Sequence, residues 1–243
     1  MPGSLSLKQA YSSSMQHWQS NLIKLVAFSS MLMDHTGVVF FPNDLTWRIV
    51  GRIAFPLFAY QLSVGYEHTS NKRSFALRLL LFAFLSQLSY YLVRREWVLN
   101  IFFTLLIGLG AIHLFAGKKL GWFGPYLLAA IVAELVVPYD GGSYGVLMIF
   151  LLYALPTFAG QIAAVAGLNV LYLFSSEDFL YNISSWGYIQ MFSLLAIPLL
   201  WGIKYLRLPV QVQGGLSHVN KWIYYVLYPL HLSALWVLKI LLA

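Results

Sequence analysis

One stretch near the amino terminus decides the fold class: LIKLVAFSSMLMDHTGVVFF, residues 22–41. It is almost wholly apolar, and it is long enough to cross a bilayer as a helix, which takes about 20 residues. Similar runs recur along all 243 residues, of which 60% are hydrophobic and only 9% charged. The mean hydropathy is +0.72. A soluble domain of this size cannot hide so much apolar surface, so the sequence predicts an all-α, polytopic membrane helix bundle.

The apolar runs divide the chain into about nine predicted membrane spans. Residues 1–20 are polar, and we expect them to form an N-terminal surface segment ahead of a single transmembrane domain over residues 21–243. Two short runs are separated only by Leu155-Pro156-Thr157, so eight spans and a re-entrant segment are the alternative. The predicted spans are residues 22–41, 47–66, 75–93, 98–116, 120–137, 143–158, 160–174, 187–203 and 221–241.

The net charge of +7 and the absence of cysteine narrow the function classes. In a membrane protein, excess positive charge follows the rule that cytoplasmic loops collect Lys and Arg, so we expect no nucleic-acid partner. A cytoplasmic N-terminus places most of these cations on the cytoplasmic side. The lack of cysteine excludes disulfides, thiolate nucleophiles and cysteine–metal sites. We expect no metal.

Two ionisable residues, Asp34 and His35, lie side by side within the first predicted span. Such residues are costly inside a membrane, and they are candidates for function. Adjacent side chains on a helix diverge by roughly 100°, so one can face a cavity while the other contacts a neighbouring helix. The alternative is a buried polar pair that ties helices together.

The stretch FPNDLTWRIVGRIAFP, residues 41–56, places Arg48 and Arg52 on one helix face. Arg52 lies deeper in the second predicted span and needs a carboxylate, for which Asp34 is the expected partner. Pro56 cannot donate a hydrogen bond to the carbonyl of Arg52, so we expect a kink there. Arg48 is equally well explained as an anchor at the membrane interface.

The last predicted span carries a polar and aromatic stripe made by Tyr224, Tyr228 and His231. His231 is a second candidate for proton transfer, although a single histidine in a span often only bridges helices. Several costly side chains project to the outer half of the membrane when the N-terminus is cytoplasmic. They are Asp34, His35, Arg52, Asn100, Asn182 and His231.

The first cytoplasmic loop, GYEHTSNKRSFALR, residues 65–78, contains Lys72, Arg73 and Arg78. Three cations in one loop can bind an anionic cofactor such as the diphosphate of coenzyme A. The alternative is a positively charged anchor that only sets the orientation of the chain.

The chain resembles the TraX family, named for a protein that acetylates the N-terminus of F pilin. The similar stretches are IKLVAFSSMLMDHTG (23–37), RIVGRIAFPLFAYQLSVGYEHTSNKRSFALRLLLFAFLSQLSYYL (48–92), LNIFFTLLIGLG (99–110), YDGGSYGVLMI (139–149), YN (181–182) and YYVLYPLHL (224–232). They follow the order of the family, but YNISSWG (181–187) stands where the family has a glycine after Tyr-Asn.

This resemblance implies an acetyltransferase in the bacterial cytoplasmic (inner) membrane that takes acetyl from acetyl-CoA. The acceptor would be an amine or hydroxyl at or beyond the outer face, such as a pilin N-terminus or a glycan. The oligomeric state stays open.

Acetyl transfer needs a base and a group that stabilises an oxyanion. We assign His35 as the base or a transient acetyl carrier, with Asp34 orienting Arg52 and with His231 as the second candidate. Further residues are expected to contact substrate or the oxyanion: Arg48, Arg52, Asn100, Tyr181, Asn182 and Tyr228. A proton-coupled transporter or flippase and a non-catalytic pilus-assembly scaffold are the alternatives.

Overall fold

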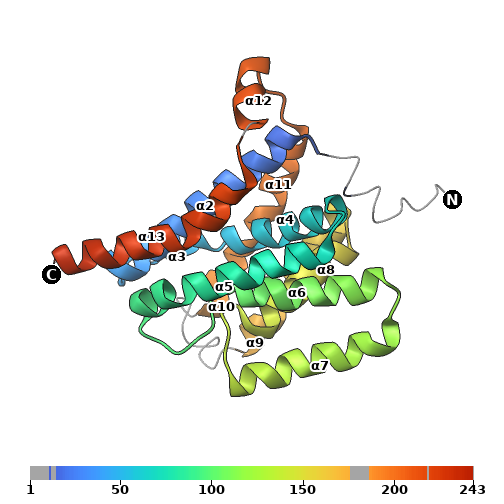
Figure 1. Ribbon diagram of the computed structural model, residues 1–243, viewed down its shortest axis with the longest axis horizontal. Helices are drawn as coiled ribbons and strands as arrows, with labels where there is room; N and C mark the ends of the chain where they lie inside the picture. Colours follow the sequence, from blue (N-terminus) through green and yellow to red (C-terminus); the bar gives the residue numbers. More distant parts are fainter. Residues whose placement is uncertain (1–10, 12–14, 176–185, 218, 243) are drawn as a thin grey trace.

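The computed structural model describes residues 11, 15–175, 186–217 and 219–242, and within these ranges its secondary-structure elements are all helices (Figure 1). The described residues contain no β-strand, only an isolated bridge between Leu99 and Tyr139. The elements are α2 (His17–Phe40), α3 (Leu45–Gly51), α4 (Ala54–His68), α5 (Lys72–Arg94), α6 (Ile101–Ala116), α7 (Leu120–Val136), α8 (Gly142–Ala154), α9 (Phe158–Ser175), α10 (Trp186–Met191), η1 (Phe192–Leu195), α11 (Ala196–Tyr205), α12 (Val210–Ser217) and α13 (Lys221–Leu241).

Five helical segments are long and apolar enough to cross a membrane, judged by length and composition. They are His17–Phe40, Lys72–Arg94, Phe158–Ser175, Gly187–Tyr205 and Trp222–Leu241, and three shorter apolar helices accompany them, Ile101–Ala116, Leu120–Val136 and Gly142–Ala154. The chain is therefore an all-α membrane protein, as the sequence predicts. The count of nine spans is not confirmed, because several predicted spans form helices of 17 residues or fewer.

The first long helix begins earlier than expected. α2 starts at His17, where Gln16 and Gln19 form a capping box, and the backbone N–H of Gln16 donates to Gln19 Oε1 at 2.8 Å. Trp18 is 3% exposed and Tyr11 is 1% exposed. The side chains of these two residues pack into the bundle, and the surface segment expected over residues 1–20 stays a prediction. Most of that segment lies outside the described residues.

The second predicted span, residues 47–66, is broken as its proline suggests. α3 ends at Gly51 and α4 begins at Ala54, so the break lies at Arg52 and Ile53. Pro56 then occupies the first turn of α4, where its missing N–H leaves no hydrogen bond unmade. The break turns the short helix α3 against α2, and this arrangement brings its arginines beside the first helix.

The later spans also contain interruptions. α8 and α9 are separate helices on either side of residues 155–157, as the sequence predicts. The predicted span 187–203 is interrupted by η1, and the short helix α12 falls in a region where no element is expected. Neither feature leaves a periodic apolar pattern in the sequence that could reveal it.

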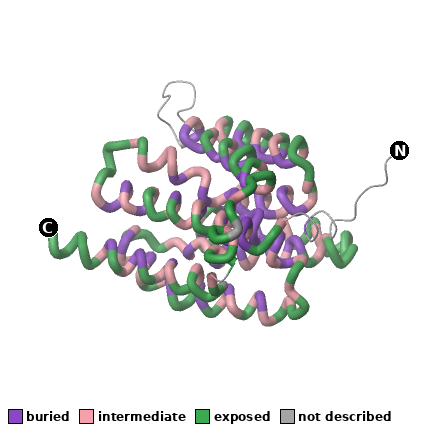
Figure 2. Tube along the Cα trace, turned by 90° about the horizontal axis from the view of Figure 1, so that it is seen from above, coloured by how far each residue is buried: buried purple, intermediate pink, exposed green. Residues whose placement is uncertain are grey.

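The helices form a bundle with two ends (Figure 1). α5, α6, α7 and α8 lie roughly parallel, with α7 at one edge, and α13 runs alongside both α2 and α5. Buried residues gather between the helices, and the outward faces are exposed (Figure 2). We call the end where α2 and α5 begin and α4 ends the near end. The far end is where α2 and α5 end and α6 begins.

Candidate functional site

A cavity of about 1410 Å³ extends through the bundle from the near end toward the far end. Lys24 and Arg78 line it toward the near end, Arg94 and Asp140 line it at the far end, and His35 also contributes to its wall. Ligand pockets usually hold about 300–1,000 Å³. The cavity is therefore large enough for a sizeable ligand, and it brings helices distant in sequence into one site.

The two membrane histidines, His35 and His231, contact each other directly. His35 Nδ1 lies 2.7 Å from His231 Nε2, and the planes of their rings are nearly parallel, with an angle of 8° between them. His231 Nδ1 lies 2.9 Å from the carbonyl oxygen of Leu227, which can only accept a hydrogen bond. Each ring is 7% exposed, but only His35 lines the cavity.

These contacts fix the tautomers of the two neutral rings. Because His231 Nδ1–H donates to Leu227, its Nε2 must accept a hydrogen bond, and His35 Nδ1–H is the donor. His35 Nε2 then carries a lone pair that no described residue occupies. A side chain held in this way can act as a base or a nucleophile toward a molecule in the cavity.

Asp34 lies beside His35 and binds two arginines. Its Oδ2 accepts from Arg48 Nη1 and its Oδ1 from Arg52 Nη2, both at 2.8 Å. Arg52 Nη1 also donates to Gln190 Oε1 at 3.2 Å. The expected pairing of Arg52 with Asp34 is present, and Arg48 shares the same carboxylate. All of these side chains line the cavity.

Glycine at position 51 permits this close approach of α3 to α2. A Cβ atom at Gly51 would lie 2.2 Å from Asp34 Oδ1 and 2.6 Å from Asp34 Cγ. Real Cβ atoms do not approach other atoms so closely, and the carboxylate is held by its two arginines. The absence of a side chain at Gly51 therefore lets the acidic residue sit against α3.

Tyr228 from α13 presents an unused hydroxyl next to the histidine pair. The residue is 3% exposed and lines the cavity, and its ring centroid lies 6.3 Å from that of His35. Its buried hydroxyl has no hydrogen-bond partner. Leaving such a donor unsatisfied costs roughly 1–3 kcal/mol, so the group is well placed to bind a substrate oxygen.

Asn100 does not fit the predicted role at an oxyanion. It is fully buried, its Oδ1 caps α6 by accepting from the backbone N–H of Phe102 at 3.0 Å, and it does not line the cavity. Its Nδ2 donates to the carbonyl of Ala83 at 2.7 Å and to Gln87 Oε1 at 2.8 Å. The amide is committed to holding α5 and α6 together. Tyr181 and Asn182 lie outside the described residues.

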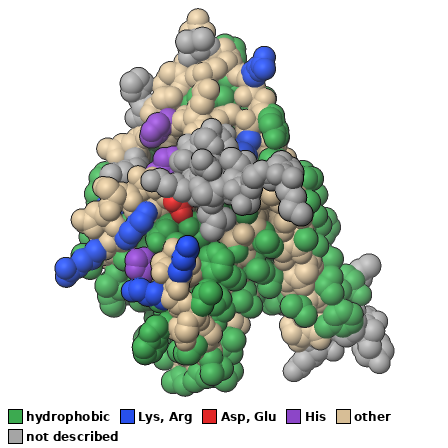
Figure 3. All heavy atoms as spheres, turned by 90° about the vertical axis from the view of Figure 1, so that its right-hand side faces the viewer, with side chains coloured by type: hydrophobic (Ala, Val, Ile, Leu, Met, Phe, Trp, Pro, Cys, Tyr) green, Lys and Arg blue, Asp and Glu red, His purple; other side chains and the backbone are tan. Residues whose placement is uncertain are grey.

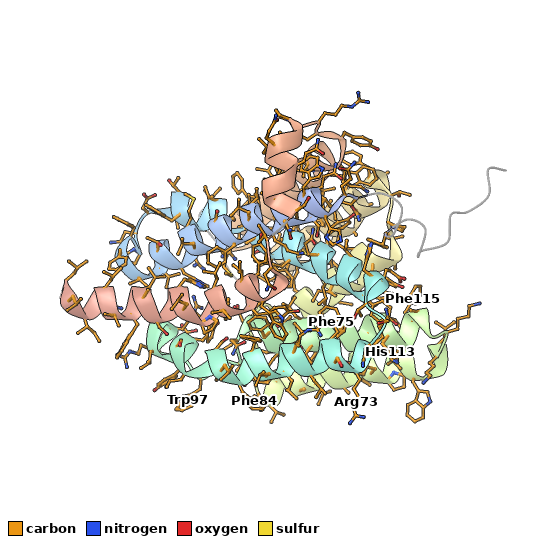
Figure 4. All side chains as sticks on the ribbon, turned by 45° about the horizontal axis from the view of Figure 1, so that its top comes forward. Arg73, Phe75, Phe84, Trp97, His113 and Phe115 are labelled. Atoms are coloured by element: carbon orange, nitrogen blue, oxygen red, sulfur yellow. The ribbon has the colours of Figure 1, made fainter. Side chains whose placement is uncertain are left out.

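The three loop cations expected to bind a coenzyme are separated by the fold. Arg78 lines the cavity, whereas Lys72 and Arg73 do not. Lys72 Nζ donates to the carbonyls of Tyr66 and Thr69, which ties together the turn before α5. Arg73 is exposed and projects away from the bundle, while Phe75 of the same helix turns inward (Figure 4). Lys, Arg and His side chains are prominent on this end of the molecule (Figure 3).

The sequence does not single out Tyr90, Arg94 and Asp140, which line the cavity at the far end. Asp140 lies in the connection between α7 and α8, which is held by hydrogen bonds from Leu99 N to Pro138 O and from Asp140 N to Leu99 O. Burial raises the pKa of Asp140, although the nearby guanidinium of Arg94 opposes this effect.

The spacing of Tyr90 and Arg94 on one face of α5 is the signal that could have found them. Asp140 gives no such signal, because an acidic residue before two glycines is typical of an ordinary turn.

Comparison with known proteins supports the same relationship across most of the chain. The sequence profile described as TraX protein matches residues 19–239. The "Probable fimbrial assembly protein FimC, serogroup H1" of Dichelobacter nodosus is 24% identical over 90% of this chain and 95% of its own length. "Protein TraX" of Escherichia coli is 29% identical over 53% of this chain and 51% of its own length. No solved structure matches. Since the profile covers nearly all of the sequence, the chain belongs to the TraX family.

Proposed function

We propose that this chain is a pilus-related membrane acetyltransferase that moves an acetyl group from acetyl-CoA to an amine or hydroxyl. One observation carries the proposal: His35 faces a large cavity while its other ring nitrogen is held by His231. The names of the relatives, TraX and fimbrial assembly protein, agree with a role connected to pili. The acceptor is then a pilin N-terminus or another group beyond the membrane.

In the proposed reaction, the acceptor nitrogen or oxygen attacks the thioester carbonyl carbon. His35 Nε2 takes the proton of the attacking group, and the carbonyl oxygen becomes an oxyanion. When the tetrahedral intermediate collapses, the carbon–sulfur bond breaks and the thiolate of coenzyme A receives the proton from His35. His231 stabilises the charged His35 ring by accepting its Nδ1–H, because His231 is itself anchored to the Leu227 carbonyl.

The oxyanion requires a donor or a positive charge near the reacting carbon. Arg48 and Arg52 line the cavity with geometry fixed by Asp34, and Tyr228 offers a hydroxyl without a partner. We assign these three residues to the carbonyl oxygen. Preorganised donors in a site that excludes water act more strongly than in solution, because they need no rearrangement as charge develops.

The same contacts allow a second route, in which His35 Nε2 attacks the thioester itself. The acetyl group would then pass from the imidazole to the acceptor, and the thiolate would leave first. Both routes use the lone pair on His35 Nε2, and they differ in whether an acetylated enzyme forms without acceptor. Mass spectrometry of protein incubated with acetyl-CoA alone separates them.

The central test is acetyl transfer by purified protein in proteoliposomes supplied with labelled acetyl-CoA and amine-bearing peptides. His35→Ala should lower kcat by at least about 100-fold, the order of a general base's contribution. His231→Phe keeps an aromatic ring but removes the acceptor for His35 Nδ1–H, so it should lower kcat by about 10- to 100-fold with the KM for acetyl-CoA little changed.

His113→Ala is the matched control for this test. His113 contacts the Tyr66 hydroxyl at 3.2 Å and does not line the cavity, so its variant should keep full activity. Thermal unfolding of each variant shows that loss of activity is not loss of fold. Full activity of a folded His35→Ala protein would exclude His35 as the base, and absence of acetyl transfer by wild type would end the acetyltransferase assignment.

A further inference from the structure

The near end of the cavity has an unusual balance of charge. Lys24 on α2 and Arg78 on α5 line it, whereas the acidic residues that line the cavity, Asp34, Glu134 and Asp140, belong to helix ends or connections at the far end. Ion pairs among the described residues involve neither Lys24 nor Arg78. We call the region around Lys24, Gln61, Arg78 and the first turn of α13 the near mouth.

Aromatic rings of α13 hold the two cations in place. Lys24 Nζ lies 5.9 Å from the ring centroid of Tyr224, and the Arg78 guanidinium carbon lies 5.9 Å from that of Trp222. Lys24 Nζ also donates a long hydrogen bond of 3.4 Å to Asn21 Oδ1. Arg78 Nε is buried without a partner. Two cations therefore flank one helix turn with hydrogen-bonding capacity to spare.

Gln61 gives a second and independent indication of a ligand. It is 8% exposed and lines the cavity, and its Oε1 accepts from Ser20 Oγ at 2.8 Å. Its Nε2 is buried and has no partner. With Oε1 accepting from Ser20, the group left without a partner is the Nε2 donor. Unpaired N–H donors beside two cations suit an anion.

The N-terminus of α13 adds to the positive electrostatic potential of the near mouth. This helix of 21 residues begins at the near mouth, and its cap residue Asn220 lines the cavity. The positive end of a helix dipole favours negative charge within its first turn.

From these contacts we infer that the near mouth binds the phosphate groups of the acyl donor, with Lys24, Arg78 and Gln61 as the binding side chains. This inference rests on the proposed function. It replaces the loop cations Lys72 and Arg73 by residues that reach the cavity.

The spacing along α2 specifies the shape of the donor. Lys24 and His35 are eleven residues apart on one continuous helix, a rise of about 16 Å. A phosphate at Lys24 is therefore far from the base at His35. The donor must carry its thioester on a long, slender arm, as coenzyme A carries it on pantetheine. A free phosphate does not bridge this distance, and an anionic lipid headgroup offers phosphate without a thioester.

The test measures binding of coenzyme A to full-length protein in nanodiscs of neutral phosphatidylcholine. Lys24→Gln and Arg78→Gln should each raise the Kd roughly 10- to 100-fold, as expected for loss of one charge-assisted contact. Lys118→Gln and Arg207→Gln remove the same charges at exposed positions near this end and should leave the Kd unchanged. Acetylpantetheine, which lacks the phosphates, should bind all five proteins, wild type included, equally.

The outcomes separate the inference from the function. If wild type binds coenzyme A and transfers acetyl, but Lys24→Gln and Arg78→Gln leave the Kd unchanged, the near mouth is not the phosphate site although the enzyme assignment stands. If wild type neither binds coenzyme A nor transfers acetyl, the proposed function fails. Loss of phosphatidylglycerol binding in the variants, with unchanged coenzyme A binding, would assign the site to lipid and overturn the inference.

Discussion

Single side chains around the cavity fall into two groups. His231 and Asn100 make their hydrogen bonds within the protein and hold other groups in place. Tyr228 and Gln61 present donors that no protein group accepts. Buried polar atoms are nearly always satisfied in folded proteins. Tyr228 and Gln61 both line the cavity, so a ligand there can complete their hydrogen bonds.

Asp140 gives a prediction at this scale because its carboxyl has a raised pKa. Burial favours the protonated carboxyl in the folded state. The protonated carboxyl therefore contributes its full stabilisation below the unfolded pKa of about 3.9, and this contribution is lost as the pH rises through the folded pKa. Asp140→Asn resembles the protonated form. Its Tm should equal that of wild type in acid and exceed it at neutral pH, measured by thermal unfolding in detergent.

Asp44 provides a control of opposite sign. A hydrogen bond from Thr46 lowers the pKa of this exposed carboxyl, so its stabilising effect is present at neutral pH and is lost as the pH falls through the folded pKa. The Tm of Asp44→Asn should therefore lie below that of wild type at neutral pH and approach it in acid. The Tm of Asp140→Asn also approaches the wild-type value in acid, but it lies above that value at neutral pH. A constant Tm difference between Asp140→Asn and wild type at all pH values would contradict the assignment.

Much of the site was accessible from the sequence at the residue scale. The cost of placing Asp34, His35 and His231 in membrane helices singles them out, and the structure brings all three together. The capping position of Asn100 could not be predicted, because a buried asparagine looks the same in sequence whether it caps a helix or faces a cavity. The sequence does not indicate that Lys24 lines the cavity, because a lysine near a helix end is expected to anchor the helix at the membrane interface.

Among the helices, the pairing of α2 with α3 matters most to the site, because Asp34 lies on one and both arginines lie on or just after the other. Gly37 and Gly51 allow this contact. A Cβ atom at Gly37 would lie 2.3 Å from Trp47 Cβ, as closely as the one at Gly51 would approach Asp34. The absence of side chains at Gly37 and Gly51 therefore sets the distance between the helices.

Gly51→Ala tests that pairing. The added methyl must push α3 away from Asp34, and overpacking of this kind costs about 1–3 kcal/mol. We expect a Tm lower by several degrees and a loss of acetyl transfer, measured on purified protein in detergent. Gly202→Ala is the control, because nothing lies within 4 Å of a Cβ atom there. Its Tm should stay the same or rise, and an equal fall in both variants would contradict the role of Gly51.

Element boundaries were predictable where a proline or a polar run interrupts an apolar stretch. Pro56 and the residues 155–157 mark real breaks. The tilt of α3 against α2 was not predictable, since it depends on which helix lies beside it. The short helix α12 was missed for a related reason, because eight mixed residues without a periodic apolar face resemble a loop.

The near and far ends of the molecule should lie on opposite sides of the membrane, and the sequence allows a direct test of which end faces the cytoplasm. It contains no cysteine, so single cysteines can be added without background. Ser70 lies at the near end, Glu96 lies at the far end, and both are exposed. With a cytoplasmic N-terminus, Ser70→Cys should react with an impermeant maleimide only in inverted vesicles, and Glu96→Cys only in intact spheroplasts. The reverse pattern would invert the topology.

Fold class and family could be read from the sequence because apolar runs and motif order need no knowledge of contacts. The cavity could not, because it arises between helices from opposite halves of the chain. Its lining from Lys24 to Tyr228 depends on α2, α5 and α13 lying side by side. Side chains that face this space look in sequence like those that face lipid.

The arginine pair on Asp34 has a consequence for the membrane that houses it. A cavity lined by polar groups inside a membrane protein can let ions leak across the bilayer. Fixed guanidinium groups in the wall of a pore repel protons and metal cations, as arginine does in water channels. Arg48 and Arg52 line the cavity and share the single carboxylate of Asp34, which leaves this part of its wall with a net positive charge. That charge disfavours the entry of cations.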